Sequence, residues 1–398
     1  MNWLIKILLT TEITMKRTQT GYTLPISTVG EQCHAFVPDA LPPQPPLQIN
    51  GELRDLIDQS LMALGRLDSI SILLPDSSRF IYMYIRKEAV LSSQIEGTQS
   101  TLSDLLLFEN EEVLGVPIDD VQEVSNYVAA INYGIKRINE GFPLSLRLIK
   151  EIHAQLLAKV CYSHQNPGEF RRTQNWIGGS RPGNALFVPP PPDCIMTCMG
   201  DLEKFLQNQP EKTPLLTKAA LAHVQFETIH PFLDGNGRLG RLLITLLLYA
   251  EEALKQPVLY LSLYFKTHRE QYYDLLQKVR TEGDWEKWLH FFMAGVKETS
   301  TQAVKTTQKI THLFENDRNK ISTLKRAGSA LRVYHALQQQ PILSIAKACG
   351  QTGLTVPTVT VAFEQLIKLD IVREMTGRKR GRLYRYDQYV SILSEGIG

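Results

Sequence analysis

Cysteine is scarce in this chain. Five cysteines occur among 398 residues, and an odd number at this low density does not support a disulfide framework. Long hydrophobic runs are absent as well: the apolar stretch from Trp3 to Leu9 is interrupted by Lys6 and is not followed by a small-residue cleavage site. We therefore expect no contact with membranes and a cytoplasmic protein with reduced thiols.

An excess of one charge is also missing. The chain has 43 Lys and Arg against 41 Asp and Glu, a formal net charge of +2, so it has no overall basic field that would hold nucleic acid. The charge is unevenly placed, because residues 325–398 hold 11 basic and 5 acidic side chains. Any binding of DNA is therefore expected in this last fifth of the chain.

The length and the 43% hydrophobic content predict two or three globular domains. Apolar residues recur at spacings of three and four from about Leu53 onward, which predicts a mainly α-helical fold. A Gly- and Pro-rich stretch, 168–192, interrupts this pattern and predicts a short β-hairpin. The expected regions are a partly extended leader (1–50), an N-terminal helical region (51–115), a core (116–298), a helical connector (299–325) and a small last domain (326–398).

One loop between two apolar helices carries an unusual set of side chains. Helices are expected over Thr217–Thr228 and Arg238–Tyr249, and the sequence between them contains glycines that let the backbone approach a ligand. A helix start followed by two arginines suits phosphate oxygens, an aspartate is a hard ligand for Mg²⁺, and a histidine can accept a proton near neutral pH. The loop predicts a polyphosphate site at which a hydroxyl attacks a phosphate. Its residues are His230, Asp234, Gly235, Asn236, Gly237, Arg238 and Arg241.

The run from His230 to Arg241, His-Pro-Phe-Leu-Asp-Gly-Asn-Gly-Arg-Leu-Gly-Arg, resembles the signature of the Fic family at every fixed position. Gly168–Arg171 and the segment ending in Phe187-Val188-Pro189 resemble the segment and the β-hairpin flap that precede the core of that family. The resemblance implies a Fic-type helical core and an enzyme, a protein adenylyltransferase. Such an enzyme transfers AMP from ATP to a Ser, Thr or Tyr hydroxyl of a protein, itself included.

The resemblance also implies roles for single residues. His230 would deprotonate the target hydroxyl, and Asp234 would hold Mg²⁺. Gly235, Asn236 and Gly237 would surround the α- and β-phosphates, while Arg238 would contact the β-phosphate region and Arg241 the γ-phosphate.

Upstream of the loop, Ser92, Glu96 and Gly97 lie on an expected helix, with Ser92 and Glu96 on one face. This pattern resembles the inhibitory motif of the Fic family. A carboxylate delivered to Arg241 would take the place of the γ-phosphate. Two other functions remain open: removal of AMP from a modified protein with the help of Glu96, and nucleotide sensing by a transcription regulator.

Residues 326–398 resemble a small winged-helix domain of α+β type. The stretches 343–349 and 355–369 have the spacing of a helix-turn-helix, and Ile371-Val372 and Leu383-Tyr384 would form strands around a basic turn, Gly377–Gly381. The basic turn favours DNA, but the second helix has no Arg or Asn with which to read bases. Homodimerisation or docking of the target is the alternative role.

Overall fold

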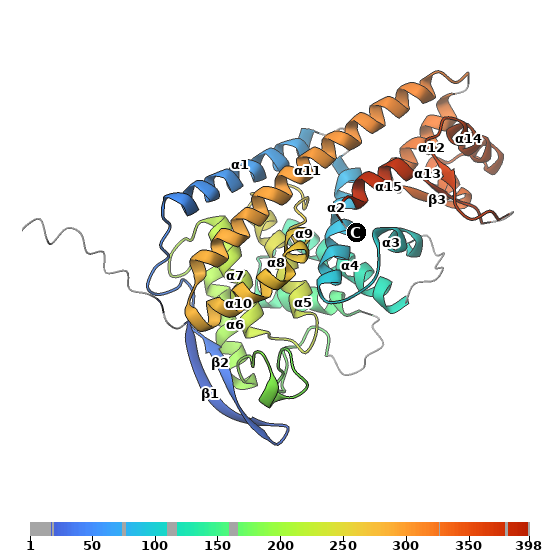
Figure 1. The fold of residues 1–398 in the computed structure, drawn as a ribbon. Helices are drawn as coiled ribbons and strands as arrows, with labels where there is room; N and C mark the ends of the chain where they lie inside the picture. Colours follow the sequence, from blue (N-terminus) through green and yellow to red (C-terminus); the bar gives the residue numbers. More distant parts are fainter. Residues whose placement is uncertain are drawn as a thin grey trace, which may run out of the picture.

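The computed structural model describes residues 17, 20–73, 77–109, 118–158, 166–325, 327–378 and 381–396. The described chain is mainly α-helical, as predicted, with two small sheets (Figure 1). In this part of the chain no helix combines the length and the hydropathy needed to cross a bilayer. The helices are α1 (Gly51–Leu73), α2 (Ser77–Ile95), α3 (Leu102–Phe108), α4 (Ile118–Asn139), α5 (Leu146–Leu156), η1 (Pro182–Asn184), α6 (Pro192–Leu206), α7 (Leu215–Ile229), α8 (Asn236–Ala250), α9 (Ser262–Thr267), α10 (Arg269–Glu282), α11 (Trp285–Ser322), α12 (Ala327–Gln339), α13 (Ile345–Thr352), α14 (Val356–Lys368) and α15 (Asp387–Ser394). The strands are β1 (Gly21–Thr28), β2 (Glu31–Pro38), β3 (Ile342–Ser344), β4 (Arg373–Glu374) and β5 (Leu383–Arg385).

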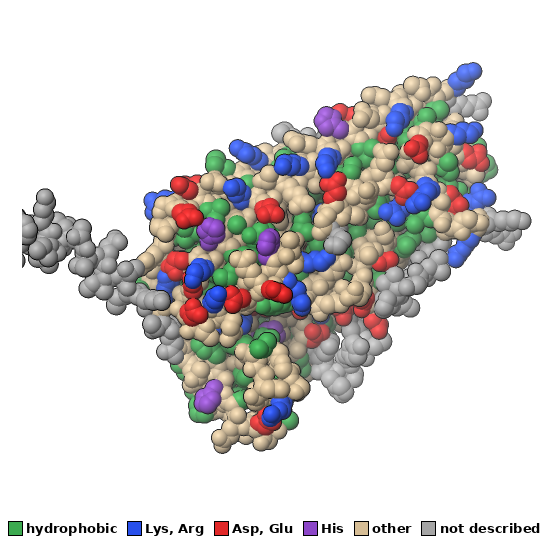
Figure 2. Space-filling model, in the orientation of Figure 1, with side chains coloured by type: hydrophobic (Ala, Val, Ile, Leu, Met, Phe, Trp, Pro, Cys, Tyr) green, Lys and Arg blue, Asp and Glu red, His purple; other side chains and the backbone are tan. Residues whose placement is uncertain are grey.

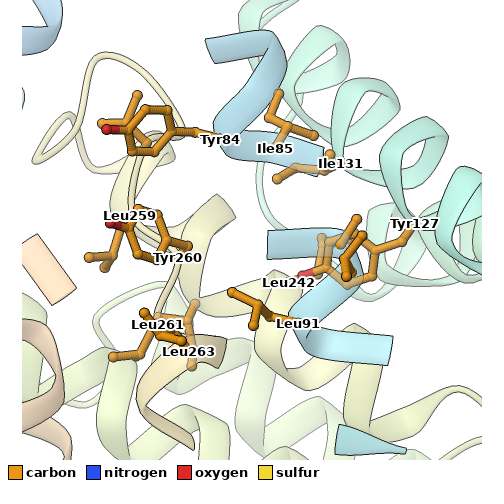
Figure 3. Packing of buried hydrophobic residues seen from close by; sticks show 14 of the residues in the cluster. Tyr84, Ile85, Leu91, Tyr127, Ile131, Leu242, Leu259, Tyr260, Leu261 and Leu263 are labelled. Atoms are coloured by element: carbon orange, nitrogen blue, oxygen red, sulfur yellow. The ribbon is translucent and has the colours of Figure 1, made fainter. Parts of the chain in front are cut away.

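Helices α7 and α8 form the centre of the fold and lie against each other. Every residue of α7 from Leu216 to Ile229 is buried, as expected for a helix that is surrounded by others on all sides. Helices α2 and α4 pack beside α8, and Figure 3 shows Leu91 of α2, Tyr127 of α4 and Leu242 of α8 in one apolar cluster. The loop between α7 and α8 therefore starts and ends on well-anchored elements.

Helix α11 runs along the molecule for 38 residues and packs along α1 (Figure 1). The expected connector, 299–325, is largely the second half of this continuous helix. On the face shown in Figure 2, basic and acidic side chains are interspersed over the helices, which agrees with the balanced overall charge.

The N-terminal part of the chain forms a β-hairpin that the sequence analysis did not anticipate. Strands β1 and β2 are antiparallel, and Val29 and Gly30 connect them with φ angles of 52° and 77°. This hairpin continues into the flap, because the Phe36 N–H donates to the Val188 carbonyl at 2.9 Å. The flap itself is minimal: a single bridge joins Ile177 to Phe187.

The last region contains α12 to α15 and an antiparallel sheet of order β3-β5-β4. The predicted helices and the strand at Leu383-Tyr384 are present, whereas β3 and α15 were not anticipated. The strand predicted at Ile371-Val372 is wrong: β4 begins two residues later, because these two side chains are buried and the Ile371 N–H donates to the Leu366 carbonyl at the end of α14. Lys379 and Arg380 of the basic turn lie outside the described residues. The region is joined to the core, since Lys87 of α2, which is 1% exposed, donates to the Glu395 carbonyl at 2.9 Å. Its nature as a winged helix remains a prediction.

Candidate active site

His230 is placed by an abrupt end of α7. The following residue, Pro231, disfavours helical backbone at His230, which adopts the left-handed conformation with φ 49°. This conformation is costly for a residue with a side chain and must be held by its surroundings. Arg171 holds it: its Nε donates to the His230 carbonyl, and its N–H donates to the Pro231 carbonyl, both at 2.9 Å.

The rest of the loop is held by hydrogen bonds within the loop and by a contact with α5. Asn236 closes the loop on itself, because its side chain accepts from the Phe232 N–H at 2.9 Å and donates to the Phe232 carbonyl at 2.8 Å. His153 of α5 lies 3.0 Å from the Asp234 carbonyl and stacks on the Phe232 ring. The amide of Asn236 is thus used structurally, and only its main chain is left for a phosphate. Sequence reasoning missed His153, because a buried histidine on an apolar helix face carries no special pattern.

The predicted site residues meet at one pocket of about 360 Å³. Arg241 and Ser92 lie just beneath it and are 2% and 0% exposed. Helix α8 begins at the pocket, so the first N–H groups of its main chain have no carbonyl of the helix to bond. The pocket is lined by Glu96, Gly97, His230, Asp234, Gly235, Asn236, Gly237 and Arg238, together with Thr98, Asp120, Glu123 and Leu233.

Glu96 reaches Arg241 from the end of α2. Arg241 Nη2 donates to Glu96 Oε1 at 2.5 Å, and its Nε donates to Ser92 Oγ at 2.9 Å. Desolvation opposes the charge of Glu96, but Arg241 outweighs it, so the pKa of Glu96 is lowered. The same pairing raises the pKa of Arg241 although burial acts against it. A side chain at position 237 would collide with the Glu96 carboxylate in the position it has here, so glycine leaves room for this contact.

Two more carboxylates lie in the interior near Arg241. Burial raises the pKa of Glu88 and of Glu227 to about 7 in each case. Glu227 is packed so tightly against α8 that any side chain at Gly240 would strike its Oε1. Arg241 therefore sits among three acidic groups, of which only Glu96 faces the pocket.

Arg238, the other arginine of the motif, is also paired with carboxylates. Arg238 Nη1 donates to Glu123 Oε2 of α4 at 2.9 Å, and its Nη2 lies 3.3 Å from Asp234 Oδ2. Its side chain is only 4% exposed. Glu123 was not predicted, and nothing in the sequence could have singled it out, because its partner is 115 positions away.

The surroundings of His230 keep its imidazole uncharged. Burial, followed by the positive charges of Arg280 and Arg171, lowers the pKa of His230 to about 4, and Glu96 acts in the opposite direction. The imidazole is therefore neutral at pH 7 and can accept a proton.

This low pKa predicts the pH dependence of the reaction. In a Glu96→Gly background, kcat/KM should stay flat from pH 8 down to about pH 5.5 and fall only below that, because only protonated His230 cannot act as a base. In the chain that keeps Glu96, whose charge raises the pKa of His230, the fall should come at higher pH than in this background. The check is a pH series of transfer rates at low ATP. An inflection near pH 6.5 would contradict the environment described for His230.

The donor set fits Mg²⁺ in the manner usual for nucleotide sites. Mg²⁺ is commonly held by one or two carboxylates together with substrate phosphates and waters. Asp234 offers such a carboxylate at the pocket, with 42% of its side chain exposed. Among the described residues no group of three or more His, Cys, Asp or Glu side chains could hold a metal ion alone.

Comparison with known proteins identifies the family. Residues 54–136 match the family model "Fic/DOC family N-terminal", and residues 143–248 match "Fic/DOC family". The matched part of this chain, residues 54–136 and 143–248, belongs to the Fic/DOC family. The predicted family is thereby confirmed, and the loop from His230 to Arg241 lies within the matched Fic segment.

Named relatives and solved structures agree with this assignment. "Protein adenylyltransferase Fic" from Aedes aegypti is 31% identical over 263 residues, 64% of this chain and 48% of that protein. The protein of the same name from Drosophila grimshawi is 34% identical over 211 residues, 52% of this chain and 40% of that protein. A Fic family protein from Desulfovibrio desulfuricans G20 shares the fold, with a TM-score of 0.57 at 22% identity, covering 86% of this chain and 98% of that chain. This chain spans less than half the length of these two adenylyltransferases.

Proposed function

We propose that this chain is a protein adenylyltransferase that transfers AMP from ATP to a hydroxyl of a protein and is restrained by Glu96. The observation that carries the proposal is the pocket in which a neutral His230 faces the start of α8 and the two arginines of the loop. The names of the Aedes and Drosophila relatives support the same reaction.

In the proposed reaction the target oxygen attacks the α-phosphorus and gives its proton to the imidazole of His230. The bond from the α-phosphorus to the bridging oxygen breaks, and pyrophosphate leaves with the electron pair. The main chain at Gly235, Asn236 and Gly237 would bind the phosphates, with Arg241 at the γ-phosphate. Asp234 would hold Mg²⁺, which when bound neutralises phosphate charge.

The restraint follows from the Glu96 contact. While Glu96 Oε1 occupies Arg241 Nη2 at 2.5 Å, the guanidinium is not available to the γ-phosphate. ATP could then bind only in an arrangement that does not present its α-phosphorus correctly. Incubation of the wild-type chain and Glu96→Gly with ATP and Mg²⁺, followed by intact mass spectrometry, tests both parts. ATP binding without any transfer would instead favour nucleotide sensing.

The flap provides a test of how the target is held. The Ile177 N–H and carbonyl both form hydrogen bonds with the main chain of Phe187. Because neighbouring residues of an extended segment direct their main-chain groups to opposite sides, the main chain of Trp176 faces the outer edge of the flap. We expect an extended target segment to add to that edge as a strand. Trp176→Pro should lower transfer to proteins about tenfold and spare ATP binding, because proline removes an edge N–H.

Trp176→Ala is the matched control for this change. It removes the same indole but keeps the N–H, so it should retain most of the transfer that Trp176→Pro loses. Titration of ATP by calorimetry should give the same Kd for both variants. Equal loss of transfer in both would mean that the indole matters rather than the strand edge.

DNA binding by residues 326–398 and homodimerisation remain predictions.

A further inference from the structure

Both arginines of the loop are paired with carboxylates that come from outside the loop. Helices α2 and α4 pack against each other and both contact α8. Glu96 at the end of α2 pairs with Arg241 at 2.5 Å, and Glu123 of α4 pairs with Arg238 at 2.9 Å. The second pair thus repeats the arrangement of the first, one helical turn closer to the start of α8.

Two of the five N–H groups of the Arg238 guanidinium are used by carboxylates, and its side chain is only 4% exposed. Its Nη1 is used by Glu123 and its Nη2 by Asp234, while its Nε is buried. A phosphate oxygen that takes either of these paired N–H groups must displace a carboxylate, and burial of the side chain limits access to the others. The contact with Glu123 is the shorter of the two, 2.9 Å against 3.3 Å.

The negative charges around Glu123 oppose the entry of a polyanion into the pocket. Glu96, Asp120, Glu123 and Asp234 all line the pocket. Burial raises the pKa of Glu123, Arg238 acts to lower it, and the other three carboxylates raise it again. The negative charge of Glu123 is therefore favoured by Arg238 and opposed by the other charges that face it. A triphosphate in the same space would meet the same repulsion.

We propose that Glu123 is a second restraint on nucleotide binding, which competes with the polyphosphate for Arg238 as Glu96 competes for Arg241. The proposal rests on the proposed function in taking ATP as the ligand. Removing Glu96 alone then frees one of the two arginines, and ATP reaches its full affinity only when Glu123 also withdraws from Arg238.

The test compares two ways of removing one negative charge from α4. In the full-length Glu96→Gly chain, Glu123→Gln removes the charge that pairs with Arg238, and Asp120→Asn removes a charge that lines the same pocket. Calorimetric titration with Mg²⁺ and an ATP analogue that has a methylene in place of the α,β-bridging oxygen, so that no AMP is transferred, should show roughly three- to tenfold tighter binding for Glu123→Gln. Asp120→Asn should tighten binding by a smaller factor, because it relieves repulsion in the pocket but releases no arginine: Asp120 accepts instead from the Gln99 N–H at 2.8 Å.

A third comparison assigns the effect to the pair itself. In an Arg238→Ala background, Glu123→Gln should tighten binding by a clearly smaller factor than with Arg238 present, since repulsion is still relieved but there is no guanidinium left to release. Melting curves show whether each variant folds. If Glu123→Gln does not fold, Glu123→Asp, which withdraws the carboxylate by one methylene, replaces it with the same expected direction.

Three results would overturn the proposal. Weaker ATP binding in Glu123→Gln would mean that Glu123 positions Arg238 for the phosphate. An equal gain in Asp120→Asn would reduce the effect to general charge. A gain in the Arg238→Ala background as large as the gain with Arg238 present would separate the effect of Glu123 from Arg238. Because binding is measured without transfer, a chain that binds ATP as expected but transfers no AMP would contradict the proposed function and leave this inference standing.

Discussion

Glu96→Gly is expected to raise AMP transfer roughly tenfold or more, including transfer onto the chain itself. In the structure Arg241 Nη2 donates to Glu96 Oε1 at 2.5 Å. In the variant this nitrogen has lost the carboxylate and can bind the γ-phosphate. A tenfold change corresponds to about 1.4 kcal/mol, less than the cost usually attached to one partner of a buried, hydrogen-bonded charge pair. Intact mass spectrometry after incubation with ATP and Mg²⁺ measures the effect as a gain of AMP units.

Two variants separate the charge of Glu96 from its volume. Glu96→Gln keeps the shape and one acceptor oxygen for Arg241 but loses the charge, so it should lie between wild type and Glu96→Gly. Glu96→Asp keeps the charge on a shorter side chain and should be the least active of the three. If Glu96→Gly binds ATP and gains no AMP while His230 is intact, the inhibitory role of Glu96 is wrong.

The sequence predicted the elements that carry the chemistry because their signals are local. The continuous apolar pattern of 217–228 and 238–249 defines α7 and α8, and the glycines between them mark the loop. His223 on the apolar helix α7 is a packed core histidine, 2% exposed with its Nε2 2.9 Å from Tyr272 Oη. The contact of Glu96 with Arg241 was foreseen from the family resemblance, not from spacing.

The remaining parts depend on contacts that a sequence does not display. The hairpin of β1 and β2 turns at Val29-Gly30, and valine at positive φ lacks the Asn-Gly or Asp-Gly signal by which such turns are found. Arg171 supports both His230 and the flap, since its Nη2 donates to the Pro190 carbonyl at 2.5 Å. Glu123 meets Arg238 only because α4 packs on α8. Each of these roles is set by tertiary packing between distant segments.

His230→Ala is expected to lower transfer by roughly 10²- to 10⁴-fold, the usual contribution of a positioned general base. The effect should fall on the chemical step, because burial, Arg280 and Arg171 keep the pKa of His230 at about 4 and the ring neutral at pH 7. The variant is best made in the Glu96→Gly background, where transfer is high enough for such a loss to be measured. Rates of AMP incorporation at saturating ATP give the comparison.

ATP affinity is the internal control for this variant. The phosphates are expected to contact the start of α8 and its arginines rather than the imidazole, so the Kd for ATP should change less than twofold in His230→Ala. Arg241→Ala in the same background should show the opposite profile, with weakened ATP binding, because the proposed γ-phosphate would take the place of Glu96 at Arg241 Nη2. Transfer within threefold of the parent in His230→Ala would remove His230 from the mechanism. Loss of ATP binding in that variant would instead make His230 part of the nucleotide site, since the loop backbone at this position is held by Arg171 and not by the imidazole.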